Sequence, residues 1–397
     1  DAEMVDSAAR RKHMKASGFC WNRWAHSSVL EVLLLKSNDE SIIATPQADG
    51  DIMLRIPVIL TAFLILTAQN SFAEHPHRVV WEGESGPGKG KHIVLIAGDH
   101  EYRGEETLPA LGRILAKHYG FKCSVFFTTD KKTGFIKPGS SYISGLEALK
   151  TADLMIVFLR FQNFPHEEMQ HFVDYLDAGK PVMGLRTSTH AFNGTRDAYA
   201  KYSNGYKGKD YKGGFGEQVL GENWVGHYGR NHRQSSILLL EKDQLSHPIL
   251  RGVKNVHTQC GGYKAFPLKG SVTLARGRIL NGMKADAEPD KSKEEMPVVW
   301  TRNYKGSKSG KEGRVFTTTH GASEDIINDG FRRMMVNGAL WCLSMDDSIK
   351  ADGNIDFVGP YKPVTFNFGG YRKNVKPSYI EGWETPILNS GPGEAKK

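Results

Sequence analysis

Four short, largely apolar segments, separated by stretches with helical periodicity, constrain the fold of this chain more than any other feature of its sequence. They are residues 92–97 (HIVLIA), 122–128 (KCSVFFT), 152–159 (ADLMIVFL) and 181–185 (PVMGL). Continuous apolar runs of this length are typical of parallel strands that are buried on both faces. The sequence therefore predicts a sheet that is covered on both sides.

Helical segments lie between these strands. Residues 105–119 have apolar side chains at helical spacing and end at Gly120, a residue that favours helix termination. Residues 146–150 form a short helical segment, and residues 165–179 open with a proline and two glutamates, which suit the first turn of a helix. Strand and helix alternating at this cadence predict an α/β fold with a doubly wound, mostly parallel sheet and helices on both faces.

The second half of the chain is less regular. Residues 191–245 are rich in Gly, Tyr, Lys and Asn and indicate a long functional insertion. Further elements are expected as strands at 237–240, 272–275, 298–301 and 314–319 and as a helix at 328–343. These elements predict one domain over residues 91–348, preceded by a lead-in at 74–90 and followed by an extended tail at 349–397.

Residues 53–73 have the pattern of a secretory signal peptide. A short basic start precedes thirteen largely apolar residues, 56–68, and the small residues Ser71 and Ala73 suit cleavage. The apolar run is short for a transmembrane span, which needs about 20 residues. We therefore expect an exported protein, periplasmic or extracellular, and interpret residues 1–52 as upstream or disordered sequence rather than a domain.

A type II membrane protein is the alternative, with the same apolar run kept as an anchor. The protein would then contact a membrane only through this uncleaved segment. N-terminal sequencing of the exported chain distinguishes the two, because cleavage leaves a start near Glu74.

Composition narrows the range of partners. The net charge is +8, but the basic residues are scattered and form no recognisable nucleic-acid module, so no nucleic-acid partner is expected. The four cysteines, Cys20, Cys123, Cys260 and Cys342, include no CxxC pair and do not indicate a structural zinc site. The sequence does not indicate an oligomeric state.

Polar clusters follow three of the predicted strands, at residues 99–102, 160–163 and 186–190, and His320 follows a fourth. In parallel α/β sheets, ligands bind beyond the carboxyl ends of the strands. Side chains that are far apart in the sequence are therefore expected to share one edge of the sheet.

Several segments together resemble the ThuA-like (trehalose-utilisation) family, which is related in fold to the class I glutamine amidotransferases. They are AGDHEYRGEETLPALGRIL, ADLMIVFLRFQNFPHEEM, PVMGLRTSTHAF, FGEQVLGENWVGHYGRNH, HPILRGV, and RVFTTTHGASED with the WCL-containing helix, and they span roughly residues 91–345. The resemblance is to an exported branch of the family. It implies a flavodoxin-like sheet and a role in the use of trehalose, related disaccharides or their oxidised forms.

The related amidotransferases place a nucleophilic cysteine at a tight strand-to-helix elbow, Gly-x-Cys-x-Gly. The matching segment here is Gly184-Leu185-Arg186-Thr187-Ser188, so Arg186 takes the place of the nucleophile. A guanidinium group has no acceptor lone pair, and glutamine amidotransfer is not expected. Arginine at this position is also a departure from many ThuA-like proteins, which carry histidine there. Arg186 is instead suited to holding a carboxylate or adjacent hydroxyls.

The candidate catalytic residues are acids and bases at the strand ends. Histidines and carboxylates exchange protons with substrates, and the alternative for the carboxylates is capping of the next helix. The candidates are His320, His190, Asp99 and Glu101.

The candidate substrate-binding residues lie in the same clusters and in the insertion: His100, Arg160, Arg186, Ser188, Trp224, His227 and Tyr228. Aromatic rings suit the C–H face of a sugar, with burial of the loop as the alternative. Ser188 and His190 do not indicate a hydrolase triad, because i and i+2 side chains point apart on an extended segment.

No cofactor is assigned from the sequence, but His227 and His232 are candidate ligands for a divalent metal. Hydrogen bonding to a sugar or to the loop backbone is the alternative role of these two histidines.

The sequence thus favours an enzyme that acts on a small carbohydrate by acid–base chemistry. A non-catalytic carbohydrate-binding module is the second hypothesis, and a partner-docking role of the tail is the third.

Overall fold

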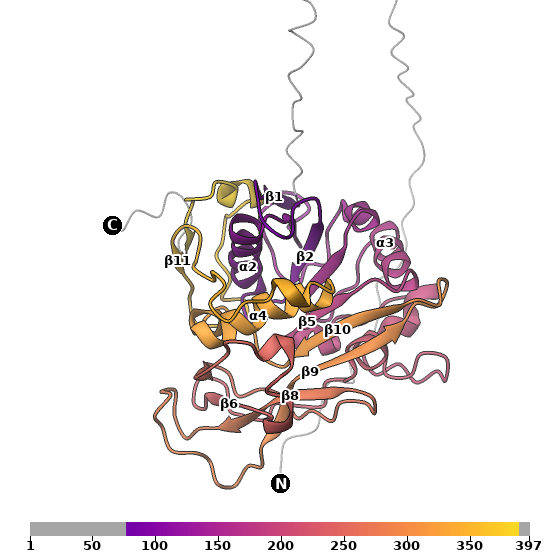
Figure 1. Cartoon of the computed structure of the whole chain (residues 1–397). Coiled ribbons are helices and arrows are strands. Elements are labelled where there is room, and N and C mark those ends of the chain that lie inside the picture. Colours follow the sequence, from indigo (N-terminus) through magenta and orange to yellow (C-terminus); the bar gives the residue numbers. More distant parts are fainter. Residues whose placement is uncertain (1–76, 389–397) are drawn as a thin grey trace, which may run out of the picture. The chain divides into compact units, whose positions relative to one another are not determined.

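A ten-stranded mixed sheet organises residues 77–388, the part of the chain that the computed structural model describes (Figure 1). Its strands are β1 (Arg78–Glu82), β2 (His92–Gly98), β3 (Lys122–Phe127), β4 (Leu154–Leu159), β5 (Val182–Leu185), β6 (Ser236–Leu240), β7 (Val256–Thr258), β8 (Val272–Ile279), β9 (Met296–Lys305) and β10 (Glu312–Thr318). Their spatial order is β1-β3-β2-β4-β5-β10-β9-β8-β6-β7.

Parallel pairing is confined to one half of the sheet. The neighbouring strands β3, β2, β4, β5 and β10 are parallel, whereas β1 at one edge and β9, β8, β6 and β7 at the other pair antiparallel. The α/β class expected from the sequence is confirmed. The antiparallel half was not predicted as such, because its strands were recognised singly and not by how they pair.

Helices cover both faces of the parallel half. The helices are α2 (Gly104–Tyr119), α3 (His166–Asp177) and α4 (Asp329–Cys342). One hydrophobic cluster joins α2 and α4 to the sheet, and a second joins α3 to it. Figure 1 shows α2 and α4 together on the near side, with α3 set apart from them.

Alternation along β2 explains its apolar sequence. Ile93 and Leu95 belong to the cluster of α2 and α4, and Val94 and Ile96 belong to the cluster of α3. All seven residues of this strand are buried. Because both faces are covered, no polar residue follows His92 in this strand.

The ends of the helices follow local signals. Gly120 lies in the left-handed region at φ +81° and its N–H donates to the backbone of α2, so it ends this helix as its sequence predicts. The Asn328 side chain accepts from the N–H of Phe331 and caps α4.

Two short segments differ from their predicted conformation. The lead-in contains β1, which pairs with β3 and buries Val79 and Trp81. Residues Arg186–His190, treated above as extended, form a 3-10 turn. In both places a short segment takes its conformation from neighbours that are distant in the sequence.

The described part of the tail packs on the domain through Arg113 of α2. This side chain is fully buried and lies over the ring of Trp81. It donates four hydrogen bonds to tail carbonyls: Nη1 to Val358 at 3.3 Å and Thr385 at 2.7 Å, and Nη2 to Ile380 at 2.7 Å and Gly382 at 2.8 Å. The tail also forms the short parallel pair β11 (Tyr361–Lys362) and β12 (Ile387–Leu388).

The predicted upstream segment 1–52, the signal peptide 53–73, the first residues of the lead-in and the last nine residues of the tail lie outside the described residues. Within residues 77–388, no helix is both long enough and apolar enough to cross a bilayer.

Candidate functional site

The carboxyl ends of three adjacent parallel strands each continue into a residue with unusual backbone geometry. Arg103 after β2, Phe161 after β4 and Arg186 after β5 have φ values of +66°, +48° and +40°. Residues other than glycine rarely adopt this left-handed region, and such positions concentrate at functional sites. These three residues lie at the edge of the sheet where the sequence predicts the polar side chains of a binding site.

The polar side chains at this edge, together with residues of the insertion, form what we call the strand-end cluster. It is defined by Asp99, Glu101, Tyr102, Arg160, Arg186, His190, Trp224, His227, Asn231 and Tyr263.

Arg186 lies at the centre of the strand-end cluster. Its side chain is fully buried, and its guanidinium carbon lies 3.8 Å from the ring centre of Tyr102 and 4.5 Å from that of Tyr263. Nη1 donates to the carbonyl of Thr319 at 2.7 Å, and the guanidinium also interacts with the Tyr102 hydroxyl, but neither Nε nor Nη2 has a partner with full hydrogen-bond geometry. A buried guanidinium with unused donors is suited to binding an anion or hydroxyl groups of a ligand.

Glu101 belongs to a hydrogen-bonded network with the insertion. The amide nitrogen of Asn231 donates to Glu101 Oε1 at 3.2 Å and to the Tyr102 hydroxyl at 2.8 Å, and that hydroxyl lies 3.0 Å from His227 Nε2. Glu101 is 4 % exposed, and burial raises the pKa of its carboxyl. Arg160 Nε, 3.7 Å from Glu101 Oε2, opposes this rise.

Partial burial and the charges of Arg186 and Arg160 lower the pKa of His227 to about 4. The ring is therefore neutral at neutral pH, and we assign its Nε2 as the acceptor of the Tyr102 hydroxyl proton. In this state His227 serves as a hydrogen-bonding group rather than a cation.

Asp99 shapes the loop that carries Glu101 and Tyr102. Its Oδ2 accepts from the backbone N–H of both residues, so the capping role considered above is present, but its Oδ1 is buried without a partner. Burial, and to a smaller extent the neighbouring carboxyls of Glu105 and Glu101, raises the pKa of Asp99 to about 7.

This shift predicts a pH-dependent stability that Asp99→Asn removes. An aspartate in the unfolded chain has a pKa of about 4. Between pH 4 and 7 the carboxyl group is therefore deprotonated in the unfolded state but still largely protonated in the folded state. The free energy of unfolding contributed by Asp99 is therefore full below pH 4 and falls as the pH rises to about 7.

The amide oxygen of Asn can accept the same two N–H groups without titrating. The free energy of unfolding of Asp99→Asn minus that of the wild type should therefore rise between pH 4 and pH 7. Above pH 7 this difference should stay constant. Urea unfolding across this range measures the difference, and a flat difference would contradict the raised pKa.

Arg160 and His100 lie at the outer side of the strand-end cluster. Arg160 Nη1 is 2.7 Å from His100 Nε2, and its guanidinium carbon lies 4.8 Å from the ring centres of both Phe161 and Phe368. Burial and the charge of Arg160 lower the pKa of His100 to about 4, so its neutral ring can accept from the guanidinium.

His190 is enclosed by aromatic rings. The ring centres of Phe161, Trp224 and Tyr263 lie 4.9, 5.0 and 5.7 Å from that of His190. Burial, followed by the charges of Arg160 and Arg186, holds the pKa of His190 well below its ordinary value. The indole Nε1 of Trp224 is buried without a partner and is available as a donor.

Three predicted site residues lie apart from these groups. His320 is fully buried, with Nε2 2.9 Å from Ser236 Oγ, and burial followed by the charge of Arg186 holds its pKa well below the ordinary value. Ser188 Oγ donates to Val157 O at 2.8 Å and accepts from the N–H of Leu159, which ties the turn to β4. The Tyr228 hydroxyl donates to the carbonyl of Glu294, away from the strand-end cluster.

The two candidate metal ligands have separate partners. His227 contacts the Tyr102 hydroxyl, whereas the ring of His232 stacks on Phe366 at 4.4 Å. Across residues 77–388, no three His, Cys, Asp or Glu side chains form a group that could hold a metal ion.

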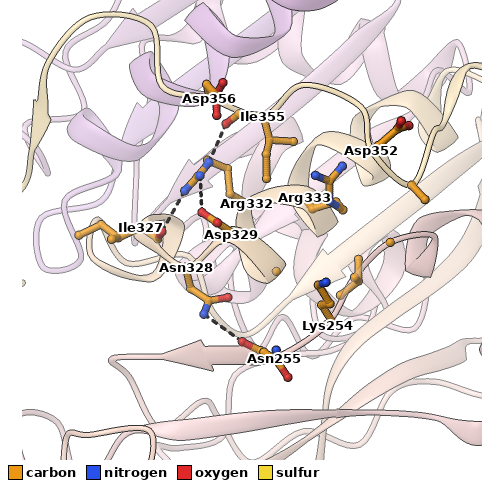
Figure 2. A pocket seen from close by; sticks show the side chains of 14 residues that line it. Lys254, Asn255, Ile327, Asn328, Asp329, Arg332, Arg333, Asp352, Ile355 and Asp356 are labelled. Atoms are coloured by element: carbon orange, nitrogen blue, oxygen red, sulfur yellow. Dashed lines mark hydrogen bonds and ion pairs between the residues drawn. The ribbon is translucent and has the colours of Figure 1, made fainter.

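A second location is a cavity of about 910 Å³ at the start of α4. Figure 2 shows Arg332 directed at Asp329 and at the backbone of Ile327 and Ile355, with Asn328 bonded to Asn255. None of the predicted site residues lines this cavity. Because the hydrogen-bonding groups of Arg332 are largely used within the protein, we place the candidate site at the strand-end cluster.

Sequence reasoning did not single out Tyr102, Phe161, Asn231, Tyr263 or the tail residue Phe368. Tyr102 and Phe161 stood inside polar clusters in which only the carboxylates, the histidine and the arginine were chosen. For Tyr263, the preceding pair of glycines was an available signal, and Gly262 indeed lies at φ +68°. No local pattern connects Phe368 to Arg160.

Comparison with known proteins gives the family. The model of the ThuA family, described as trehalose utilisation, matches residues 93–342. Among solved structures, the chain is similar to a ThuA-like protein from Parabacteroides merdae at 15% identity and a TM-score of 0.41, covering 70% of this chain and 98% of that chain. A ThuA-like protein from Bacteroides uniformis shows 15% identity and a TM-score of 0.39, covering 68% and 98%.

A search of the curated proteins found no match. The family model covers well over half of the chain and includes the four parallel-strand ends that carry the strand-end cluster and His320. The chain therefore belongs to the ThuA family, which is linked to trehalose utilisation.

Proposed function

We propose that the protein is an exported enzyme that acts on a sugar or an oxidised sugar derivative, of the type used in trehalose or disaccharide utilisation. The observation that carries this proposal is a set of buried polar atoms in the strand-end cluster that have no hydrogen-bond partner. They are Arg186 Nε and Nη2, Trp224 Nε1, Asp99 Oδ1 and Asn231 Oδ1. Buried polar groups are normally paired, and sugar hydroxyls both donate and accept.

Acid–base chemistry is assigned to Glu101. Its pKa is raised by burial, which brings it closer to neutral pH, where a carboxyl group can both take and return a proton. Arg186 would face the oxygen on which negative charge develops. Hydrolysis, isomerisation and elimination at an oxidised sugar all fit this pair, whereas glutamine amidotransfer does not fit an arginine at the elbow.

The other predicted catalytic residues take supporting roles in this proposal. Asp99 holds the Glu101 loop through two backbone hydrogen bonds. His190 presents a neutral ring between Phe161 and Trp224. His320 is next to Thr319, whose carbonyl accepts from Arg186, and it acts there as a positioning residue.

A non-catalytic carbohydrate-binding module is the second candidate. The observation that favours it is the neutral state of His100 and His227, whose pKa values of about 4 make them poor proton donors at neutral pH. In a module, these rings and Trp224 would serve only to contact the sugar.

Two finer features belong to the same proposal. The apolar run before Ala73 supports export. The parallel order β3-β2-β4-β5-β10, with helices on both faces, supports a doubly wound, flavodoxin-like arrangement of this half of the sheet.

The proposal predicts that a sugar stabilises the protein and that Arg186→Met abolishes much of this effect. In a thermal-shift screen of trehalose, keto-sugars and sugar acids, a ligand at 100 times its Kd adds about 2.7 kcal/mol of stability. Loss of charged hydrogen bonds in Arg186→Met should weaken the Kd about 10- to 100-fold. The stability of the unliganded protein should change by less than about 1 kcal/mol, because Met removes a buried charge and still packs between Tyr102 and Tyr263.

Arg276→Met is the control, since Arg276 is half-buried and paired with Glu241 on the antiparallel half of the sheet. It should leave the Kd unchanged. A ligand that binds wild type and Arg186→Met equally well would place the site elsewhere, and the absence of any sugar-induced shift would argue against the substrate class.

A further inference from the structure

The tail passes beside the strand-end cluster at residues 366–370. The Phe366 ring is fully buried, with its centre 4.9 Å from that of Tyr102 and 4.4 Å from that of His232. The N–H of Gly369 donates to the carbonyl of His100 at 3.1 Å, and Arg103 donates to the carbonyl of Gly370. The backbone of this part of the tail is therefore held on both sides of residue 368.

Phe368, between these anchors, is 54 % exposed. Its ring centre lies 4.8 Å from the guanidinium carbon of Arg160 and 5.7 Å from the ring centre of His100. A large aromatic side chain that remains exposed at a fixed position at the edge of the site offers a flat apolar surface on which a sugar ring can stack.

This ring continues a row of contacting groups that begins in the insertion. The centres of Trp224 and His190 are 5.0 Å apart, those of His190 and Phe161 are 4.9 Å apart, and Arg160 lies 4.8 Å from both Phe161 and Phe368. The row joins the insertion, two strand ends and the tail. Phe368 is thus the outermost ring of this row beside the strand-end cluster.

We propose that the C-terminal tail completes the binding site, with Phe368 as a stacking platform for a sugar ring. This inference rests on the proposed function. The family model ends at residue 342, so the platform lies outside the part of the chain that defines the family. Arg160 lies over one face of the Phe368 ring, and the C–H face of a pyranose ring packs on the opposite face, which Arg160 leaves open.

The test compares four variants of the full chain by calorimetric titration with trehalose, glucose and glucuronic acid. Phe368→Ala should weaken binding of whichever sugar binds wild type by about tenfold. Phe368→Tyr should bind as wild type does, because it keeps the ring. Phe368→Leu covers Arg160 with an apolar group but has no flat ring, so it should behave like the alanine variant.

Tyr379→Ala is the control for changes in the tail, since Tyr379 is also exposed and lies outside the row. Wild-type affinity in both Phe368→Ala and Phe368→Leu would overturn the platform while leaving the proposed function intact. Wild-type affinity in Phe368→Leu alone would also overturn the platform. The role of the side chain would then be to shield Arg160 with apolar atoms, and a flat ring would not be needed. Failure of all three sugars to bind wild type would overturn the proposed substrate class and this inference with it.

Discussion

Glu101→Gln is expected to lower turnover of the sugar substrate about 100- to 10,000-fold, the usual contribution of a general acid or base. Glutamine keeps the shape of the side chain and can still accept from Asn231, but it takes up no proton at neutral pH. The Kd should therefore stay within about threefold of the wild-type value. Steady-state kinetics together with calorimetric titration separate the two quantities.

Glu105→Gln is the matched control for this substitution. Glu105 is also buried and lies only four residues along the chain, but it pairs with Arg103 at 2.9 Å and does not belong to the strand-end cluster. Its replacement should affect stability more than turnover. An active Glu101→Gln enzyme would contradict the assigned role, and a wild-type protein that binds sugar without turnover would favour the module.

The sequence predicted the parallel half of the sheet because strands that are buried on both faces have largely continuous apolar sequences. β2 is apolar after His92, and β4 is apolar throughout, because alternate residues meet different layers of helices. Once these strands were recognised, the general position of Asp99, Arg160 and Arg186 followed, because the carboxyl ends of neighbouring parallel strands share one edge.

The parts that were not predicted depend on contacts between distant residues. Tyr263 faces Arg186 from a segment with no strong periodicity, and Phe366 reaches Tyr102 from the tail. The turn at Arg186–His190 is held by hydrogen bonds between Ser188 and β4, one donated and one accepted by the hydroxyl, which the local sequence does not reveal. Sequence therefore indicated which edge of the sheet carries the polar groups, but not which rings enclose them.

Arg113→Met is expected to lower the free energy of unfolding by about 3–5 kcal/mol, an effect typical of breaking a buried polar network. Burial lowers the pKa of Arg113 to about 10, so the group is still charged at neutral pH and all four of its bonds to tail carbonyls are charge-assisted. Methionine can fill the space over Trp81 but leaves these carbonyls without their donor. Chemical denaturation measures the loss.

Arg333→Met is the matched control, because Arg333 makes a single bond to the tail, to the carbonyl of Gly353, and should cost less than about 1.5 kcal/mol. Limited proteolysis should cut the tail earlier in Arg113→Met than in the control. Since the tail also carries Phe368, its release should weaken sugar binding about as much as Phe368→Ala does. Equal stability of the two arginine variants would contradict the role of Arg113 as the main anchor of the tail, and an intact Kd in a variant whose tail is released would separate the tail from the site.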